Sequence, residues 1–569
     1  MKRLLNCLTL MLMVATTASA QTSYTSAAKV SAQQGITIYG VVECDGQPLA
    51  DVAVSDGYEI VRTDKRGVYQ LSSAKRNGNV FITIPSGYEA PTVGDDVVPQ
   101  FWAELTADAQ TPERHDFSLR KVDNDRHVIV AVTDIHLANR LNDVEMFTNS
   151  FVPNLTAELE QYRKQGIPVY TISMGDNSFD IYWYDYLYDI GDFRRTLAEI
   201  GYPTQLFNTM GNHDNDGATP CDENTDWNAT AKYRKAFGPT YYSINIGKVH
   251  YVMLDNIRYI NKPGGKKAKG IVGSRNYEYT ISPEQLAWLE KDLALVTDKT
   301  TPIVIGVHSP IYRYKNGMNG KININLKEPS ATELTRLLQP FSSVHILSGH
   351  AHRNRVTYGK TDSSQPELQN IIDHNIVAVS GSLWYSSGFG GPMLGSMGEP
   401  AGYKIFTVDN TDIKWYFKPT QFPASEQFRC FDMNAVRDYF AKNGEVKVFL
   451  DHFPARTNFA QWDRENRVMI HVWDWAPDWK IEVTENGKPL EVKRQKTENP
   501  QMIVGLDIPN TLWLIKFDKK NNKRKLHPHM FHAVASAPDT PIEVTVTDSF
   551  GNKYHQTMER PKPFSVHMK

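Results

Sequence analysis

Cysteine is scarce in this chain, with four residues among 569. Cys7 lies in an apolar N-terminal stretch, which leaves Cys44, Cys221 and Cys430 for the rest of the protein. An odd and small number of cysteines excludes a fold built on a framework of disulfides, although a single bridge is compatible with them. Cys221 lies near a histidine-containing motif described below, but its position is interpreted as incidental.

An excess of charge of one sign is also absent. The 62 Lys and Arg residues nearly balance the 64 Asp and Glu residues, so the net charge is −2. This balance favours neither a nucleic acid nor an acidic membrane surface as a partner. A lysine-rich loop at residues 264–270 fits a solvated surface better than a phosphate-steering role, although both interpretations are compatible with it.

Long apolar runs are absent after residue 20, so no later segment is predicted to span a bilayer. Residues 1–20 combine Lys2 and Arg3 with a mostly apolar run and end in Ala18-Ser19-Ala20. This pattern predicts a secretory signal peptide that is cleaved before Gln21. A membrane anchor is the alternative, which the short apolar core disfavours. We therefore expect a secreted or periplasmic protein, and its length indicates several domains.

Five apolar runs end directly before residue types that bind metal ions. The first, Val128–Val132, is followed by Asp134 and His136. The other four end before Asp176, before Asn212, His213 and Asp214, before His308, and before His350 and His352. Ligands of open α/β sheets bind beyond the carboxyl ends of the strands, so these side chains are expected to meet. Nitrogen and oxygen ligands without thiolate favour Zn, Mn or Fe.

The ordered motifs D-x-H, G-D, G-N-H-D, H and G-H-x-H resemble those of the calcineurin-like metallophosphoesterases, over roughly residues 124–380. The resemblance implies a layered αββα domain of the α/β class, which hydrolyses a phosphate mono- or diester. It also implies two metal ions that supply a bound hydroxide as nucleophile. The implied ligands are Asp134, His136, Asp176 and His352 for one metal, and Asp176, Asn212, His308 and His350 for the other, with Asp176 bridging.

The same resemblance implies that His213 is not a ligand but the acid that protonates the leaving group. Many family members carry an aspartate three positions after the bridging one, and it orients this histidine. Phe179 occupies that position here, and Asp180 follows it. Asp214 is therefore a candidate to orient His213, and the sequence leaves open which aspartate does so.

Aromatic residues are concentrated at positions 179–188, where they either wall a substrate pocket or pack locally. The predicted substrate contacts are Trp183, Tyr184, Tyr186, Arg353 and Trp384. Arg353 is included because it adjoins His352, and Trp384 because it begins a glycine-rich loop near the site. A phosphorylated small molecule, a glycan or a lipid head group are all compatible substrates, and nucleic acid is not expected.

Two β-rich segments flank the central domain. Residues 36–120 predict a β-sandwich module, and residues 381–569 predict a C-terminal β domain. The expected strands of the latter include Tyr403–Val408, Ile413–Phe417 and Val446–Leu450. Its histidines at positions 527, 529 and 532 have no partnering carboxylate or cysteine pattern, which favours a satisfied or surface cluster over a metal site.

A second function remains compatible with the sequence, namely a catalytically silent, secreted binding protein on a phosphoesterase scaffold. A silent copy is expected to lose metal ligands. None of the ligands that the resemblance implies is missing here, which favours the enzyme.

Overall fold

The computed structural model describes residues 30–106, 108–265, 268–314, 322–362, 366–384, 393–513 and 522–567. The predicted signal peptide, residues 1–20, and part of the lysine-rich loop lie outside these ranges. Cys44, Cys221 and Cys430 are all free thiols, so no disulfide joins the described residues. In the same ranges no helix is both long and apolar enough to cross a membrane.

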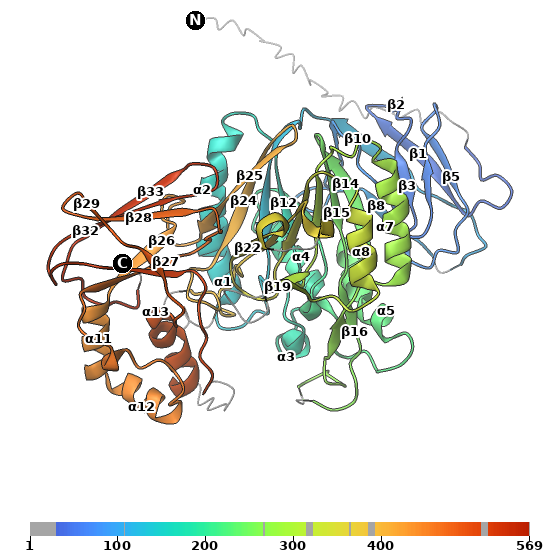
Figure 1. Cartoon of the computed structure of the whole chain (residues 1–569). Helices are drawn as coiled ribbons and strands as arrows, with labels where there is room; N and C mark the ends of the chain where they lie inside the picture. The colour runs from blue at the N-terminus through green and yellow to red at the C-terminus, as the bar shows by residue number, and fades with distance from the viewer. Residues whose placement is uncertain are drawn as a thin grey trace, which may run out of the picture.

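Two central β-sheets share one hydrophobic core and carry helices on their outer faces (Figure 1). The first sheet has the order β13 (Gln205–Asn208), β12 (Val169–Ser173), β11 (Arg126–Val132), β24 (Gly402–Asp409) and β25 (Asp412–Pro419). The second has the order β14 (Tyr242–Ile246), β15 (Val249–Met253), β18 (Ile303–Gly306), β21 (Val344–Ser348), β23 (Ile371–Asn375) and β22 (Arg355–Tyr358). The predicted layered α/β architecture is confirmed.

The helices begin where their sequences favour a start. Ser282 caps α7 (Pro283–Leu295) by accepting a hydrogen bond from the backbone N–H of Gln285, and proline occupies the first turn. A second helix, α8 (Ser330–Leu338), follows later in the chain. On the other sheet, α2 (Val152–Arg163) and α4 (Ile190–Glu199) bury leucine and phenylalanine side chains against β11.

Parallel pairing places the ends of the key strands side by side. Strands β11, β12 and β13 run parallel in one sheet, and β15, β18 and β21 run parallel in the other. Because their carboxyl ends lie at the same edge, the segments that follow them meet there.

The N-terminal region forms two facing sheets, as expected for a sandwich. One contains β1 (Ile38–Cys44), β2 (Gln47–Pro48), β5 (Val68–Leu71), β7 (Tyr88–Glu89), β9 (Glu113–Arg114) and β10 (Phe117–Lys121). The other has the order β4 (Ile60–Arg62), β3 (Ala53–Ser55), β6 (Asn79–Ile82) and β8 (Trp102–Glu104). The buried indole of Trp288 in α7 donates to Ser55 Oγ at 3.1 Å and so joins this region to the central domain.

The C-terminal part differs from its prediction in two respects. Strand β24 pairs with β11, and β25 pairs with β24, so both strands extend the central sheet rather than belonging to a separate domain that starts at residue 381. The segment predicted as the strand Val446–Leu450 lies in the helix α12 (Gly444–His452). Asn443 caps that helix, and Val446 and Phe449 face a buried cluster at helical spacing, which overrides the β propensity of the segment.

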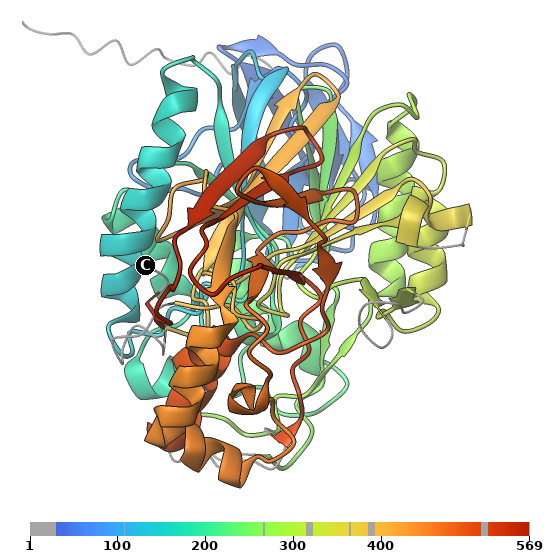
Figure 2. The same ribbon diagram turned by 60° about the vertical axis from the view of Figure 1, so that its left-hand side comes forward.

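The remaining C-terminal strands form two further sheets, which Figure 2 brings to the front in orange and red. One sheet has the order β26 (Phe428–Asp432), β27 (Arg467–Val472), β31 (Met530–Val534) and β30 (Lys493–Arg494). The other has the order β29 (Lys488–Leu490), β28 (Lys480–Glu485), β32 (Ile542–Thr547) and β33 (Lys553–Met558). The helix α11 (Met433–Lys442) follows β26 directly.

A buried ion pair joins the central sheet to this C-terminal part. Lys404 of β24 lies 2.8 Å from Asp474, and neither side chain is more than 1% exposed. The Asp474→Ala variant leaves the ammonium group buried without its partner, so we expect a loss of about 3–5 kcal/mol in the free energy of unfolding. Denaturant unfolding measures it.

The matched control is Asp412→Ala on the adjacent strand, which removes an exposed pair with Lys414. An exposed pair contributes at most about 1 kcal/mol, so the control should unfold almost as the wild type does. Equal losses in the two variants would contradict the assignment of the Lys404–Asp474 pair as a stabilising link.

Candidate metal centre

The seven predicted metal ligands all lie at the common edge of the two central sheets. They come from the segments after five strands: β11, β12, β13, β18 and β21. Five of the seven have a left-handed backbone, with φ between 51° and 63°: Asp134, His136, Asp176, His350 and His352. Such conformations are uncommon for residues with a side chain and concentrate at functional sites, where the surrounding structure enforces them.

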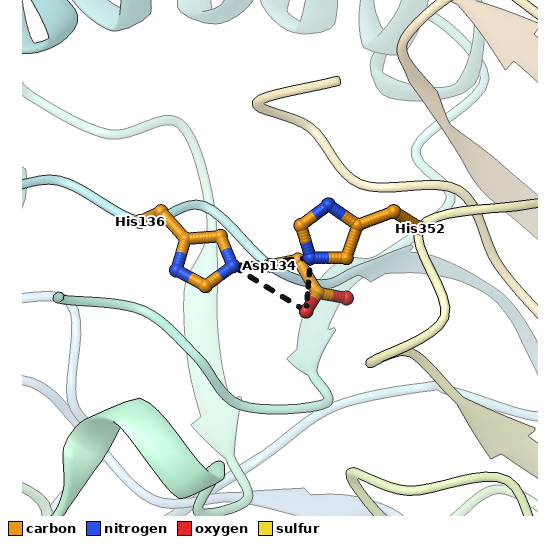
Figure 3. A group of neighbouring side chains, drawn as sticks. All are labelled: Asp134, His136 and His352. Carbon is orange, nitrogen blue, oxygen red and sulfur yellow. Dashed lines mark hydrogen bonds and ion pairs between the residues drawn. The ribbon is translucent and has the colours of Figure 1, made fainter. Parts of the chain in front are cut away.

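One group of donor atoms consists of Asp134, His136 and His352 (Figure 3). Nε2 of His352 lies 3.1 Å from Oδ1 of Asp134 and 3.2 Å from Nε2 of His136. Nε2 of His136 lies 3.6 Å from the same carboxylate oxygen. Three donor atoms from two different sheets therefore point at one another.

A second group contains Asp176, His308 and His350. Nε2 of His308 lies 3.2 Å from Oδ2 of Asp176, 3.1 Å from Nδ1 of His350 and 3.0 Å from Oδ1 of Asn212. Oδ2 of Asp176 is also 3.7 Å from Nε2 of His136 in the first group. Asp176 therefore lies between the two groups.

The surroundings of these rings favour metal coordination. Nδ1 of His308 bonds the carbonyl of Met174 at 2.8 Å, and Nδ1 of His352 bonds that of Gly381 at 3.0 Å. A carbonyl accepts, so each Nδ1 carries a proton, and each Nε2 is the nitrogen that faces the centre. Facing lone pairs repel unless a proton or cation lies between them, so this donor set fits two divalent ions.

The electrostatics agree with this arrangement. Burial lowers the pKa of His136 to about 4 and that of His350 to about 3, so both rings are neutral ligands at pH 7. Burial also opposes a charge on His308, but the Asp176 carboxylate outweighs it and raises the pKa of His308 to about 9. The neighbouring histidines hold the pKa of both Asp134 and Asp176 below the ordinary value despite burial. The metal-free centre therefore carries a proton that a cation must displace.

His213 lies beside this centre, and its ring centroid is 5.2 Å from that of His136. Its Nδ1 lies 2.7 Å from Oδ1 of Asp180, a fully buried carboxylate, and 2.8 Å from a guanidinium nitrogen of Arg275. Arg275 also bonds both oxygens of Asp180. The prediction that Asp214 orients His213 is therefore wrong, and Asp180 is the carboxylate in contact.

Asp214 faces the protein interior for an identifiable reason. Its carboxylate accepts hydrogen bonds from the backbone N–H groups of Asn177, Ser178 and Gly211 at 3.0–3.1 Å. Burial and the neighbouring Asp176 charge raise its pKa to about 7. Asp214 thus ties the segment after β12 to the segment after β13 and has no contact with the His213 ring.

The residues predicted to contact the substrate differ in burial and in hydrogen bonding. The indole N–H of Trp183 donates to Ser178 Oγ and that of Trp384 to the carbonyl of Ile135, and both rings are at most 2% exposed. Tyr184 donates to Asp216, whereas Tyr186 is 42% exposed. For the two tryptophans this favours the packing alternative. Arg353 lines a cavity that none of the seven predicted ligands lines.

The structure adds residues that the sequence motifs did not indicate. The segment that leads into β17 (Tyr277–Tyr279) supplies Arg275, and the hydroxyl of Tyr279 lies 3.0 Å from Nε2 of His350. The Phe179 ring packs 4.6 Å from that of His213. Arg275 and Tyr279 belong to no metal-binding motif and follow an irregular segment, so only the tertiary structure reveals their position.

Comparison with known protein families gives three matches along the chain. They are the N terminal of Calcineurin-like phosphoesterase at residues 36–122, Calcineurin-like phosphoesterase at 127–354, and the C terminal of Calcineurin-like phosphoesterase at 373–554. "Probable purple acid phosphatase 20" of Arabidopsis thaliana is 27% identical over 193 residues, which are 32% of this chain and 40% of the plant protein. The chain thus spans less than half the length of that relative.

Among solved structures, a dimetal phosphatase from Danio rerio matches at 11% identity and a TM-score of 0.31, over 52% of this chain and 96% of that one. A purple acid phosphatase from yellow lupin, Lupinus luteus, matches at 14% identity and a TM-score of 0.33, over 66% of this chain and 68% of that one.

Metal binding should depend on pH in a defined direction. The ring of His308 is protonated below its pKa of about 9 and must lose that proton to bind a metal. We expect loading with Zn²⁺ or Mn²⁺ at pH 7 to release about one proton from this ring, and the affinity to fall about tenfold for each further unit of acidity. Calorimetry in buffers of different ionisation enthalpy measures both. An affinity that stays constant between pH 6.5 and 8.5 would contradict the role of His308.

Proposed function

We propose, from the premise that the chain belongs to the calcineurin-like phosphoesterases, that it hydrolyses a phosphate mono- or diester with the help of two metal ions. The observation that carries this proposal is the convergence of carboxylate, amide and imidazole donors from two sheets on one edge. No member of the donor set that such a centre needs is replaced by a residue unable to coordinate.

Asp134, His136, Asp176 and His352 would hold one ion, and Asp176, Asn212, His308 and His350 the other. When bound, two such ions bind the phosphate by charge and lower the pKa of a shared water. Asp176 suits the shared position because it lies within 3.7 Å of donors from both groups and its anionic form is the favoured one. Zn, Mn and Fe are the metals that this mixed nitrogen and oxygen donor set favours.

His213 is the group placed to give a proton to the departing alcohol. Asp180 holds Nδ1 of the ring, which leaves Nε2 as the nitrogen that can face a substrate. The ring is partly accessible, with 22% of the side chain exposed, whereas the Asp180 carboxylate is buried. The Arg275 guanidinium fixes that carboxylate from its other side and brings a positive charge next to the position expected for the phosphate.

We further propose that the protein acts outside the cytoplasm. The support is the N-terminal sequence, in which Lys2 and Arg3 precede an apolar run that ends in Ala18-Ser19-Ala20. A phosphorylated small molecule, a glycan or a lipid head group is then the substrate class to which such an enzyme has access.

A substrate panel tests the proposal. The purified protein, loaded in turn with Mn²⁺, Zn²⁺ and Fe, is assayed on phosphate monoesters and diesters of sugars, alcohols and lipid head groups. We expect metal-dependent release of phosphate or of an alcohol from at least one class, and a chelator should abolish it. Full metal loading without hydrolysis of any ester would instead favour a silent binding protein.

The His213→Ala variant should keep both metals, because His213 belongs to neither donor group, but should slow the reaction about 10²–10⁴-fold. The defect should be large for alkyl esters, whose leaving group needs a proton, and small for nitrophenyl esters, whose leaving group departs without one. Rates on matched alkyl and nitrophenyl substrates measure the difference.

Two carboxylate variants provide the control. Asp180→Asn should reproduce part of the same dependence on the leaving group, because Asp180 contacts the ring. Asp214→Asn should lower stability without that dependence, because the Asp214 carboxylate accepts hydrogen bonds from the backbone of both motif segments and from the side chains of Asn177 and Ser178. An equal loss on alkyl and nitrophenyl esters in His213→Ala would show that His213 is not the acid.

A further inference from the structure

A cavity of about 250 Å³ lies where the central domain meets the C-terminal sheet that contains β27, β30 and β31. Arg353 and Arg355 reach it from the central domain, directly after the segment that carries His352. The C-terminal part contributes Trp475, Arg494, His527 and His529. Because residues of both parts form the wall, the cavity exists only when the two are assembled.

The wall carries an excess of positive charge. Three guanidinium groups line the cavity, and arginine keeps its charge at every physiological pH. Asp362 is the one carboxylate in the described lining, and it already accepts a hydrogen bond from the backbone N–H of Tyr358. Behind the lining, the buried carboxyl groups of Glu399 and Asp373 interact with the charges of Arg353 and Arg355. Three guanidinium groups around one small space still favour an anion within it.

A buried polar atom in the wall is without a partner. His529 is 3% exposed, and its Nδ1 has no hydrogen-bond partner among the described residues. Its neighbour His527 is satisfied, because Nε2 lies 3.1 Å from His471 and Nδ1 accepts from the backbone N–H of His529. Nδ1 of His529 is shielded from solvent, so a guest in the cavity does not reach it. Burial lowers the pKa of the His529 ring, so the ring is neutral and adds no charge to the wall.

The rest of the wall is mostly apolar. Two contacts within it also hold the Arg494 guanidinium in a fixed position. Val356, Met397, Pro477 and Leu526 contribute hydrophobic surface. The guanidinium of Arg494 lies 4.1 Å from the centre of the Trp475 ring and also donates to the carbonyl of Pro528. These two contacts orient the charge before any ligand arrives, which reduces the entropy lost on binding.

We propose that this cavity is a second binding site, which takes a small oxyanion carried on an apolar or ring-shaped body, such as the sulfate or phosphate ester of a monosaccharide. Arg353, Arg355 and Arg494 would bind the oxyanion. The body of the ligand would lie against Trp475 and its apolar neighbours. The volume is below the roughly 300–1,000 Å³ of pockets for drug-sized ligands, so the guest is small.

Calorimetric titration with glucose 6-sulfate tests the proposal, with inorganic sulfate and glucose as the two partial ligands. A sulfate ester suits the test because binding is then measured separately from phosphate-ester hydrolysis. We expect the sulfated sugar to bind more tightly than either part, and Arg494→Ala to raise its dissociation constant about tenfold or more. Arg494→Glu should raise it further.

The matched control is Lys493→Ala, which removes a positive charge from the same strand at a residue that does not line the cavity. It should bind as the wild type does and keep the wild-type melting temperature and the wild-type rate on p-nitrophenyl phosphate. Absence of binding by the wild type, or equal weakening in Lys493→Ala and Arg494→Ala, would overturn the proposal. Binding that is lost in His350→Ala and kept in Arg494→Ala would place the ligand at the metal centre instead.

Discussion

The hydrogen bond from the backbone N–H of His350 to the carboxylate of Asp134, 2.8 Å long, joins the edges of the two central sheets. The segments must come very close for it to form. A Cβ on Gly349 would lie 1.7 Å from Thr133 Oγ1, so only glycine fits there. Asp176 makes a similar link within its own sheet, since it accepts from the backbone N–H of His213 at 2.7 Å. Each carboxylate thus fixes the backbone of a neighbouring motif as well as facing the centre, so the arrangement of the candidate ligands and the packing of the sheets depend on the same atoms.

The N-terminal and C-terminal regions both contact the central domain, and the C-terminal region also contributes strands to it. The C-terminal part completes the first central sheet through β24 and β25 and supplies half of the arginine-lined cavity. The N-terminal sandwich contacts α7 through Ser55. The metal centre and the arginine-lined cavity therefore lie within one continuous body, and the segment that carries His352 and Arg353 contributes to both.

The convergence of the seven candidate ligands could be predicted from the sequence because each lies within a few residues of the end of an apolar strand. Parallel strands place such ends together whatever the details of the loops. The contact between Asp180 and His213 was not predicted from the sequence. It depends on the turn of a short helix, η2 (Asp180–Tyr182), which directs the Asp180 carboxylate at His213. The alternation in Val446–Leu450 resembled a strand, whereas the Asn443 cap and the contacts of Phe449 produce a helix. Pairing of β24 with β11 joins residues far apart in sequence, and no local pattern encodes it.

The central claim is that seven side chains from two sheets hold two metal ions at one edge. Anomalous diffraction from crystals of the protein loaded with Mn²⁺ or Zn²⁺ tests it most directly, because it locates each ion and its ligands. The account predicts two peaks about 3.5–4 Å apart. One should be bound by Asp134, His136 and His352, the other by Asn212, His308 and His350, with Asp176 between them. A single peak, or two peaks that do not share Asp176, would contradict it.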